Sequence, residues 1–152
     1  MAAGEGVTAQ LDALVELFNR KGMDLPDGLF DRRTQFVLNG APYETLLGRD
    51  PDDPLVRMIA RGPAGYRFAA KALQHALPDA ALARGELDLA EGPEGPALRG
   101  RVWLSGHARD TGERVDTVVA VELWLDGATV VRAAADVDVA ALETLRRARL
   151  AP

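Results

Sequence analysis

The sequence predicts an α+β fold in which helices cover one face of a bent antiparallel sheet. Apolar residues recur at helical spacing through the first half of the chain, as far as Pro78. After Pro78 the apolar period changes to two, and turn residues divide the stretch into successive strands. Helices followed by hairpin-linked strands are typical of α+β domains, because the helices then pack on one face of the sheet.

The first half is expected to contain short helices and one strand. The first helix begins at Thr8, which is placed to cap it, and ends near Gly22. A brief helix is expected after a turn at Pro26, and further helices over residues 55–59 and 63–77. Between them, a strand over 34–40 ends at an Asn-Gly pair, and residues 40–54 form a surface loop or short hairpin.

The second half is expected to form a curled sheet of strands joined by hairpins. Two stretches, 83–92 and 96–110, flank a Gly/Pro-rich turn, and two more, 111–125 and 128–139, flank an Asp-Gly turn. Consecutive strands joined in this way run antiparallel. Residues 139–150 form either a last short helix or an extended tail.

The alternation of apolar and polar residues assigns one buried and one solvent-exposed face to these strands. One face of 115–125 is almost entirely aliphatic, whereas the other carries Asp116, Glu122 and Trp124. Burying a large aliphatic side chain is worth roughly 1.5–3 kcal/mol, and burying an unpaired carboxylate is costly, so the aliphatic face should meet the helices. The same test places Trp103 outside, on the surface that carries Trp124. We expect a homodimer through this outer face; the alternative is that each indole packs singly under arginine stems.

Composition bounds the class of protein. The chain has 152 residues, which suits one domain over 1–152, with residues 1–7 expected to be flexible. It has no apolar run long enough to span a bilayer and no secretory signal pattern, so we expect a cytoplasmic protein with no membrane partner. Zero cysteines exclude thiolate chemistry, and a formal charge of −5 with scattered basic residues argues against nucleic acid as a partner.

Several segments, in this order, resemble a known family. They are "ELFNRKGMDL" before a strand ending in "LNG", "GYRFAAKALQHALPD" before the sheet, and "SGHARDTGERV" leading to "VELWLDGATVV". Together they resemble the SnoaL-like polyketide cyclases of the nuclear transport factor 2-like superfamily. The resemblance implies a cone-shaped half-barrel with an internal pocket, commonly a homodimer. Such folds host cyclases, isomerases, dehydratases and epoxide hydrolases, and also binding modules without activity.

The resemblance also implies positions for acid/base residues, and this chain departs from them. The His and Asp that such cyclases carry on the last strand fall on Arg132 and Ala134, and the two Asp of steroid-isomerase relatives fall on Asn39 and Val121. Neither asparagine nor valine can act as a carboxylate base, so isomerisation of that type is disfavoured. A register shift on the last strand would instead bring Asp136 into the pocket.

Three residues are therefore candidates for catalysis: Arg132, Asp136 and Asn39. Arg132 would stabilise an enolate or anchor a carboxylate if it faces the pocket; otherwise it is an arginine at the sheet rim. Asp136 would act as an acid or base, or be a solvated strand-end carboxylate. Asn39 would polarise a carbonyl, or form the turn. The two histidines, His75 and His107, support neither a triad nor a metal site.

The expected function is cyclisation or rearrangement of an apolar, polyketide-type intermediate in natural-product or antibiotic biosynthesis, without a cofactor and largely by positioning. The rivals are epoxide opening by Asp136 and a non-catalytic binding or dimerisation module. The residues expected to contact the substrate are mostly apolar: Phe18, Phe36, Leu38, Tyr43, Met58, Tyr66, Leu73, Val102, Leu104, Val119, Val121, Leu123 and Ala134.

Overall fold

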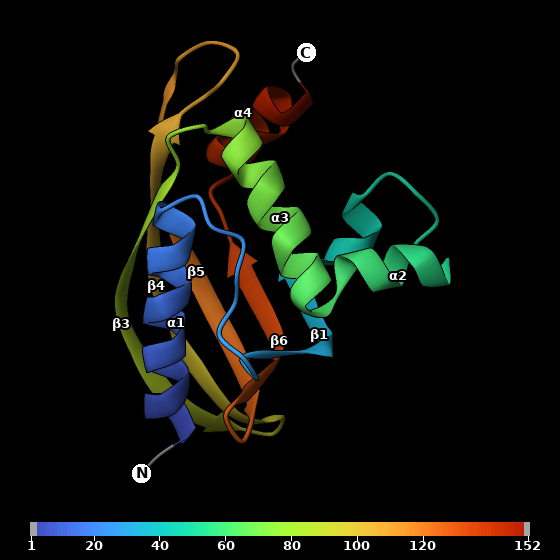
Figure 1. Cartoon of the computed structure of the whole chain (residues 1–152), viewed down its shortest axis with the longest axis vertical. Coiled ribbons are helices and arrows are strands. Elements are labelled where there is room, and N and C mark those ends of the chain that lie inside the picture. Colours follow the sequence, from blue (N-terminus) through green and yellow to red (C-terminus); the bar gives the residue numbers. More distant parts are fainter. Residues whose placement is uncertain (1–2, 151–152) are drawn as a thin grey trace.

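The computed structural model describes residues 3–150, which fold into four α-helices, one short 3-10 helix and six strands (Figure 1). The helices are α1 (Ala3–Asn19), α2 (Pro54–Ala60), α3 (Gly62–Ala76) and α4 (Val139–Leu150), and the 3-10 helix is η1 (Tyr43–Leu46). The strands are β1 (Phe30–Leu38), β2 (Ala41–Pro42), β3 (Ala81–Gly92), β4 (Gly95–His107), β5 (Arg114–Asp126) and β6 (Thr129–Asp136).

The strands form one bent, unclosed sheet in the order β2-β1-β6-β5-β4-β3. Strands β3 to β6 pair antiparallel through successive hairpins, as the sequence predicts. Helices α1 and α3 lie on the same side of this sheet, α1 against β3 and α3 against β1 (Figure 1). The predicted α+β class, with a curved sheet wrapped around the N-terminal helices, is therefore confirmed.

The sheet is mixed, however, because β1 pairs parallel with β6. The expectation of a purely antiparallel sheet is wrong at this one pair. Hairpin signals can reveal only strands that are neighbours in the sequence, whereas Phe36 of β1 pairs with Ala133 of β6. This long-range pairing carries no local signature.

The two faces of the sheet are as alternation predicts. Leu98 of β4 pairs with Leu123 of β5, and both side chains are buried against the helices. Trp103 pairs with Val118 on the opposite face, where the two residues are 43% and 42% exposed. We refer to these as the inner and outer faces.

Two local expectations need correction, and one open alternative is decided. Helix α1 begins at Ala3, so Thr8 lies within the helix and does not cap it. The flexible start expected over residues 1–7 stays a prediction, and residues 1–2 of it lie outside the described residues. The brief helix after Pro26 is a turn in which Gly28 has a φ of +79°, and Phe30 already begins β1. Residues 139–150, left open between helix and tail, form α4.

The helical part of the described chain contains no segment that is both long and apolar enough to cross a membrane.

Candidate functional site

The side chains expected to enclose a pocket pack largely on one another. One apolar cluster includes Phe18, Leu104 and Val119, and a second includes Leu29, Leu98 and Leu123. Tyr66 of α3 packs against both clusters, so it lies where they meet. The inner space between α3 and the sheet is therefore occupied mainly by core side chains of the protein itself.

The expected substrate contacts fall into three groups. Phe18, Leu104, Val119 and Leu123 are buried in the core. Others are partly buried, namely Phe36, Leu38, Tyr43, Tyr66, Leu73, Val102 and Val121. The remaining two do not face the interior, since Met58 is 62% exposed on α2 and Ala134 pairs with Glu122 on the outer face.

Arg132 also lies on the outer face. Its guanidinium carbon is 4.6 Å from the ring centroid of Trp124, and one of its terminal nitrogens is 3.7 Å from a carboxylate oxygen of Glu94. The pairing of β5 with β6 shifts register between Trp124 and Leu125, so Leu125 pairs with Val130 and Trp124 with Arg132. Of the two alternatives left open for Arg132, the structure supports the outward arginine at the sheet rim, because Arg132 lies beside Trp124 while Val130 is buried.

The other two catalytic candidates are also directed away from the inner face. Asp136 is exposed and pairs with Ala120 at the end of β6, on the outer side of the sheet. The side-chain amide of Asn39 is hydrogen-bonded to the backbone of Val137. The structure therefore does not bring Arg132, Asp136 and Asn39 together around one cavity.

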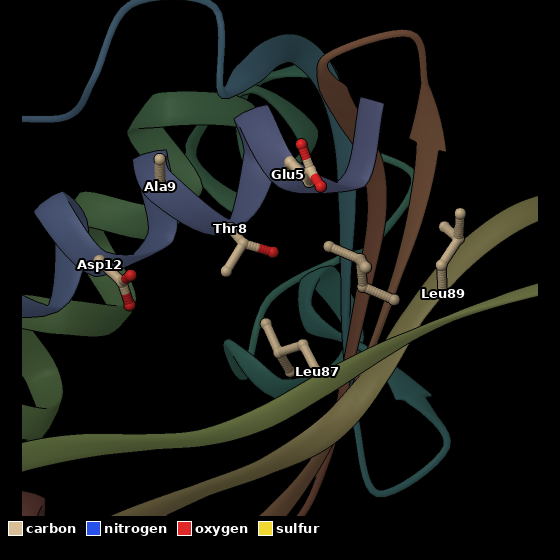
Figure 2. A pocket seen from close by; sticks show the side chains of 7 residues that line it. Glu5, Thr8, Ala9, Asp12, Leu87 and Leu89 are labelled. Carbon is tan, nitrogen blue, oxygen red and sulfur yellow. The ribbon is translucent and has the colours of Figure 1, made fainter. Parts of the chain in front are cut away.

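A groove of about 390 Å³ opens between α1 and the inner face of β3 and β4 (Figure 2). Figure 2 shows Thr8 of α1 and Leu87 of β3 pointing toward each other across it. The sheet side is apolar, and the helix side carries two carboxylates and a hydroxyl. The residues that line the groove are Glu5, Thr8, Ala9, Asp12, Leu87, Leu89 and Leu98.

One of the groove carboxylates is engaged in an ion pair. Asp12 accepts from Nε of Arg84 at 2.5 Å and from a terminal nitrogen of the same guanidinium at 3.2 Å. This hydrogen bond raises the pKa of Arg84 above its ordinary value. The pair joins α1 to β3 beside the groove, and both carboxylate oxygens of Asp12 accept hydrogen bonds from Arg84. A proton-transfer role for Asp12 is therefore disfavoured.

Tyr66 is the polar side chain at the centre of the apolar interior. Desolvation by burial raises the pKa of its phenol to about 12, so the hydroxyl stays protonated across the physiological range. Leu98 and Leu87, which line the groove, belong to the same apolar cluster that packs against Tyr66. Tyr66 itself is not among the residues that line the groove, so its hydroxyl belongs to the packed interior.

Sequence reasoning did not single out the groove. Its walls come from residues 5–12 and 87–98, and only the tertiary packing of α1 on β3 brings them together. One signal was present, because alternation places Leu87 and Leu89 of β3 on one face of that strand. Among residues 3–150, no group of three or more His, Cys, Asp and Glu side chains is arranged to hold a metal ion.

A bent, unclosed sheet with helices on its inner face is the cone-shaped α+β fold of the nuclear transport factor 2-like superfamily. The chain is similar in fold to a SnoaL-like polyketide cyclase from Agrobacterium tumefaciens, at 17% identity over 94% of this chain and 96% of that one, with a TM-score of 0.63. A Bacillus subtilis protein named as a candidate isomerase is 13% identical over 97% of both chains, with a TM-score of 0.68.

A third similar structure is a protein of unknown function from Exiguobacterium, 17% identical over 86% of this chain and 98% of that one, with a TM-score of 0.60. The sequence matches no family model and no characterised protein sequence. At these identities the likeness establishes the fold, and the predicted resemblance to SnoaL-like proteins is confirmed at that level.

Proposed function

We propose that the chain binds an apolar small molecule in the groove between α1 and the inner face of β3 and β4. The observation that carries this proposal is the groove itself, whose volume of about 390 Å³ lies in the range of small-molecule sites. Its sheet side offers the aliphatic side chains of Leu87, Leu89 and Leu98, while Thr8 and Glu5 provide polar contacts on the helix side. Such walls suit a mainly hydrocarbon ligand with one or two oxygen functions.

The reaction that we propose is cyclisation or a related rearrangement of a polyketide-type intermediate. A flexible poly-carbonyl chain gains most from being held in one reactive shape, which can supply several kcal/mol of the barrier, about 7–11 in the best oriented cases.

Epoxide opening by Asp136 receives no such support. That reaction needs a carboxylate near the bound ligand, and Asp136 is exposed on the outer side of the sheet. The groove carboxylate of Asp12 is committed to Arg84.

As the assembled unit we propose a homodimer joined through the outer face. Trp103 and Val118 form an exposed apolar pair at the surface of β4 and β5. Exposed aromatic surface of this kind commonly marks a protein contact.

Binding is tested with the neutral apolar dye Nile red, titrated by fluorescence. Leu89 is 47% exposed, so Leu89→Asp introduces a charge in the groove without opening the core. We expect it to raise the dye's Kd at least tenfold. The matched control is Leu55→Asp on α2, where Leu55 is 65% exposed and outside the groove, and which should leave the Kd unchanged. Equal affinities for wild type and Leu89→Asp would contradict the site.

Catalysis is tested with linear poly-β-keto thioesters, with cyclised product followed by mass spectrometry. Leu89→Asp, which places a charge in the groove, should lower kcat/KM at least tenfold together with dye binding, because the same walls would hold the substrate. Leu55→Asp should leave kcat/KM unchanged. Absence of product from the wild type across the thioester series, with dye binding intact, would contradict the catalytic part and leave a binding module.

A further inference from the structure

The helix wall of the groove carries its charges unevenly. Glu5, Thr8 and Asp12 follow one another on α1 at intervals of three and four residues, so they lie on one face of the helix. Arg84 compensates the charge of Asp12, since both carboxylate oxygens of Asp12 accept from its guanidinium. Glu5 lies seven positions earlier, about 10 Å along the helix axis. Within residues 3–150, Glu5 takes part in no ion pair, and it is exposed.

Helix α1 runs antiparallel to β3, and this direction decides what lies opposite Glu5. The side chain of Asn19, late in α1, is hydrogen-bonded to the backbone of Leu82, early in β3. Asp12 lies further back along the helix, and its partner Arg84 lies further along the strand. The face of α1 before Asp12 therefore lies over the later part of β3.

Strand β3 brings a second carboxylate to that end of the groove. Glu5 and Leu89 lie at the same end, away from Asp12 (Figure 2). Glu91 follows Leu89 at the two-residue period of a strand, so both lie on the same face. The register agrees, because Leu89 pairs with Leu98 of the groove, and Glu91 pairs with Pro96 two positions along β4. Glu91 is exposed just beyond the apolar wall.

This end of the groove is therefore negatively charged beside an apolar surface. Among residues 3–150, those that line the groove include no lysine, arginine or histidine. The amino end of α1 contributes roughly half a positive charge, which the carboxylates of Glu5 and Glu91 outweigh. The aliphatic side chains of Leu87, Leu89 and Leu98 exclude water from one side of a bound ligand, which strengthens the attraction of a cation to these carboxylates.

We propose that the groove selects ligands that carry a protonated amine at one end of an apolar body. The ammonium group lies at Glu5, with Glu91 beyond it, and the hydrocarbon lies along Leu87, Leu89 and Leu98. A carboxylic acid of the same length is rejected, because its charge has the same sign as that of the two carboxylates. This inference rests on the proposed function and narrows its substrate class to amine-bearing molecules.

Three ligands with the same ten-carbon chain test the preference: decylammonium, decanol and decanoate. Each is titrated into the full chain by calorimetry at neutral pH, below the concentration at which it forms micelles; the amine is then protonated and the acid ionised. We expect the Kd of decylammonium to be at least tenfold lower than that of decanol. The Kd of decanoate should be at least tenfold higher than that of decanol. Raising the salt concentration to about 1 M should shrink both differences, because it screens exposed charges.

Two nearly isosteric variants locate the preference. Glu5→Gln and Glu91→Gln change exposed side chains and leave the core intact. Glu5→Gln should reduce the ratio of the decanol Kd to the decylammonium Kd at least threefold. The double variant should bring the two Kd values within twofold of each other and leave that of decanol unchanged. The matched control is Asp88→Asn, an exposed site on the opposite face of β3, which removes the same charge and should leave the ratio unchanged.

Three results would overturn the inference: equal Kd values for decylammonium and decanol in the wild type, tighter binding of decanoate than of decanol, or a ratio that falls as much in Asp88→Asn as in Glu5→Gln. Nile red is neutral, so its titration reports the groove without the head group. Dye binding that Leu89→Asp weakens, together with equal Kd values for the three ligands, would contradict only this inference. Absence of binding of the dye and of all three ligands would contradict the proposed function as well.

Discussion

The side-chain amide of Asn39 spans both backbone groups of Val137. Its Nδ2 donates to the carbonyl oxygen of Val137 at 3.0 Å, and its Oδ1 accepts from the backbone N–H of Val137 at 2.7 Å. Asn39 has a φ of 48°, in the left-handed region that asparagine tolerates. Between the two roles that the sequence left open for Asn39, the structure supports the turn.

Replacement of Asn39 should therefore lower stability. Asn39→Ala loses both hydrogen bonds and places a Cβ-bearing residue without a polar side chain in the left-handed region, so we expect the free energy of unfolding to fall by about 2 kcal/mol. Asn39→Gly loses the same hydrogen bonds but relieves the backbone, and should cost less. Urea denaturation measures both. An Asn39→Ala protein as stable as wild type would show that the two hydrogen bonds contribute nothing.

Alkaline titration should reveal the environment of Tyr66. The folded-state pKa of about 12 exceeds the ordinary value of 10.0 because burial disfavours the phenolate. The associated stabilisation is fully present below pH 10 and is lost as the pH rises from 10 to about 12. Ultraviolet absorbance should show Tyr66 ionising late, and Tyr66→Phe should remove that step. Tyr43→Phe, which removes the other tyrosine, should leave it. A step near pH 10 in Tyr43→Phe would contradict the buried placement.

The pair formed by Asp79 and His107 should make a contribution to the free energy of unfolding that depends on pH in the acid range. The side chain of His107 contacts a carboxylate oxygen of Asp79 at 2.6 Å, and its backbone N–H donates to the other at 2.7 Å. Two hydrogen bonds lower the pKa of Asp79 below 3.8. The one with the side chain of His107 has the larger effect, and the one from the backbone N–H of His107 has the next largest. The contribution is therefore present above about pH 4 and is lost as the pH falls through the lowered pKa.

Asp79→Asn tests this expectation. The difference in unfolding free energy between wild type and variant, measured in urea from neutral pH downward, should stay constant to about pH 4 and shrink below it. Ser105→Ala, on the same outer side of β4, is a control that should show no such pH dependence. A difference that is independent of pH would contradict the role of the ionised carboxylate.

Replacing Arg61 alone should destabilise the protein more than replacing Arg61 and its partner Glu44 together. Glu44 of η1 has a side chain only 8% exposed and accepts from Nε of Arg61 at 2.8 Å. Arg61→Met leaves this carboxylate buried without its cation, so we expect a loss of about 3 kcal/mol. The double variant Arg61→Met with Glu44→Gln should recover part of it. Thermal and urea unfolding measure the stability of both variants. A double variant no more stable than Arg61→Met would contradict the idea that the single variant suffers from a buried, unpaired carboxylate.

The faces of β4 and β5 could be predicted from the sequence because the side-chain period of a strand is two and one face of each is aliphatic. Leu98 and Leu123 were placed inside, and Trp103 outside, without reference to any partner strand. At β6 the sequence left two alternatives open for Arg132, the pocket and the sheet rim. There a shift in pairing between Trp124 and Leu125 decides which side Arg132 occupies, and a single-residue irregularity reverses every assignment that follows.

The candidate site was less predictable than the fold. The groove depends on α1 lying against β3, a contact between segments about 80 residues apart, and no local pattern encodes that distance. The sequence also could not predict that the interior is filled, because Phe18 and Leu104 satisfy the same periodicity whether they line a cavity or pack together. The burial of Glu44 was not predictable either, because nothing in the sequence of the acidic loop distinguishes the one carboxylate that is buried.

The parallel pairing of β1 with β6 has a consequence for biosynthesis. Apart from the two-residue strand β2, β1 has no neighbour in the sheet until residues 129–136 have left the ribosome. Helix α3 packs on β1 and precedes β6 by about 50 residues, so it is available to cover Phe30 before the strand pairing forms. Closing the sheet requires residues 129–136, so the domain cannot complete its core before this strand has been synthesised.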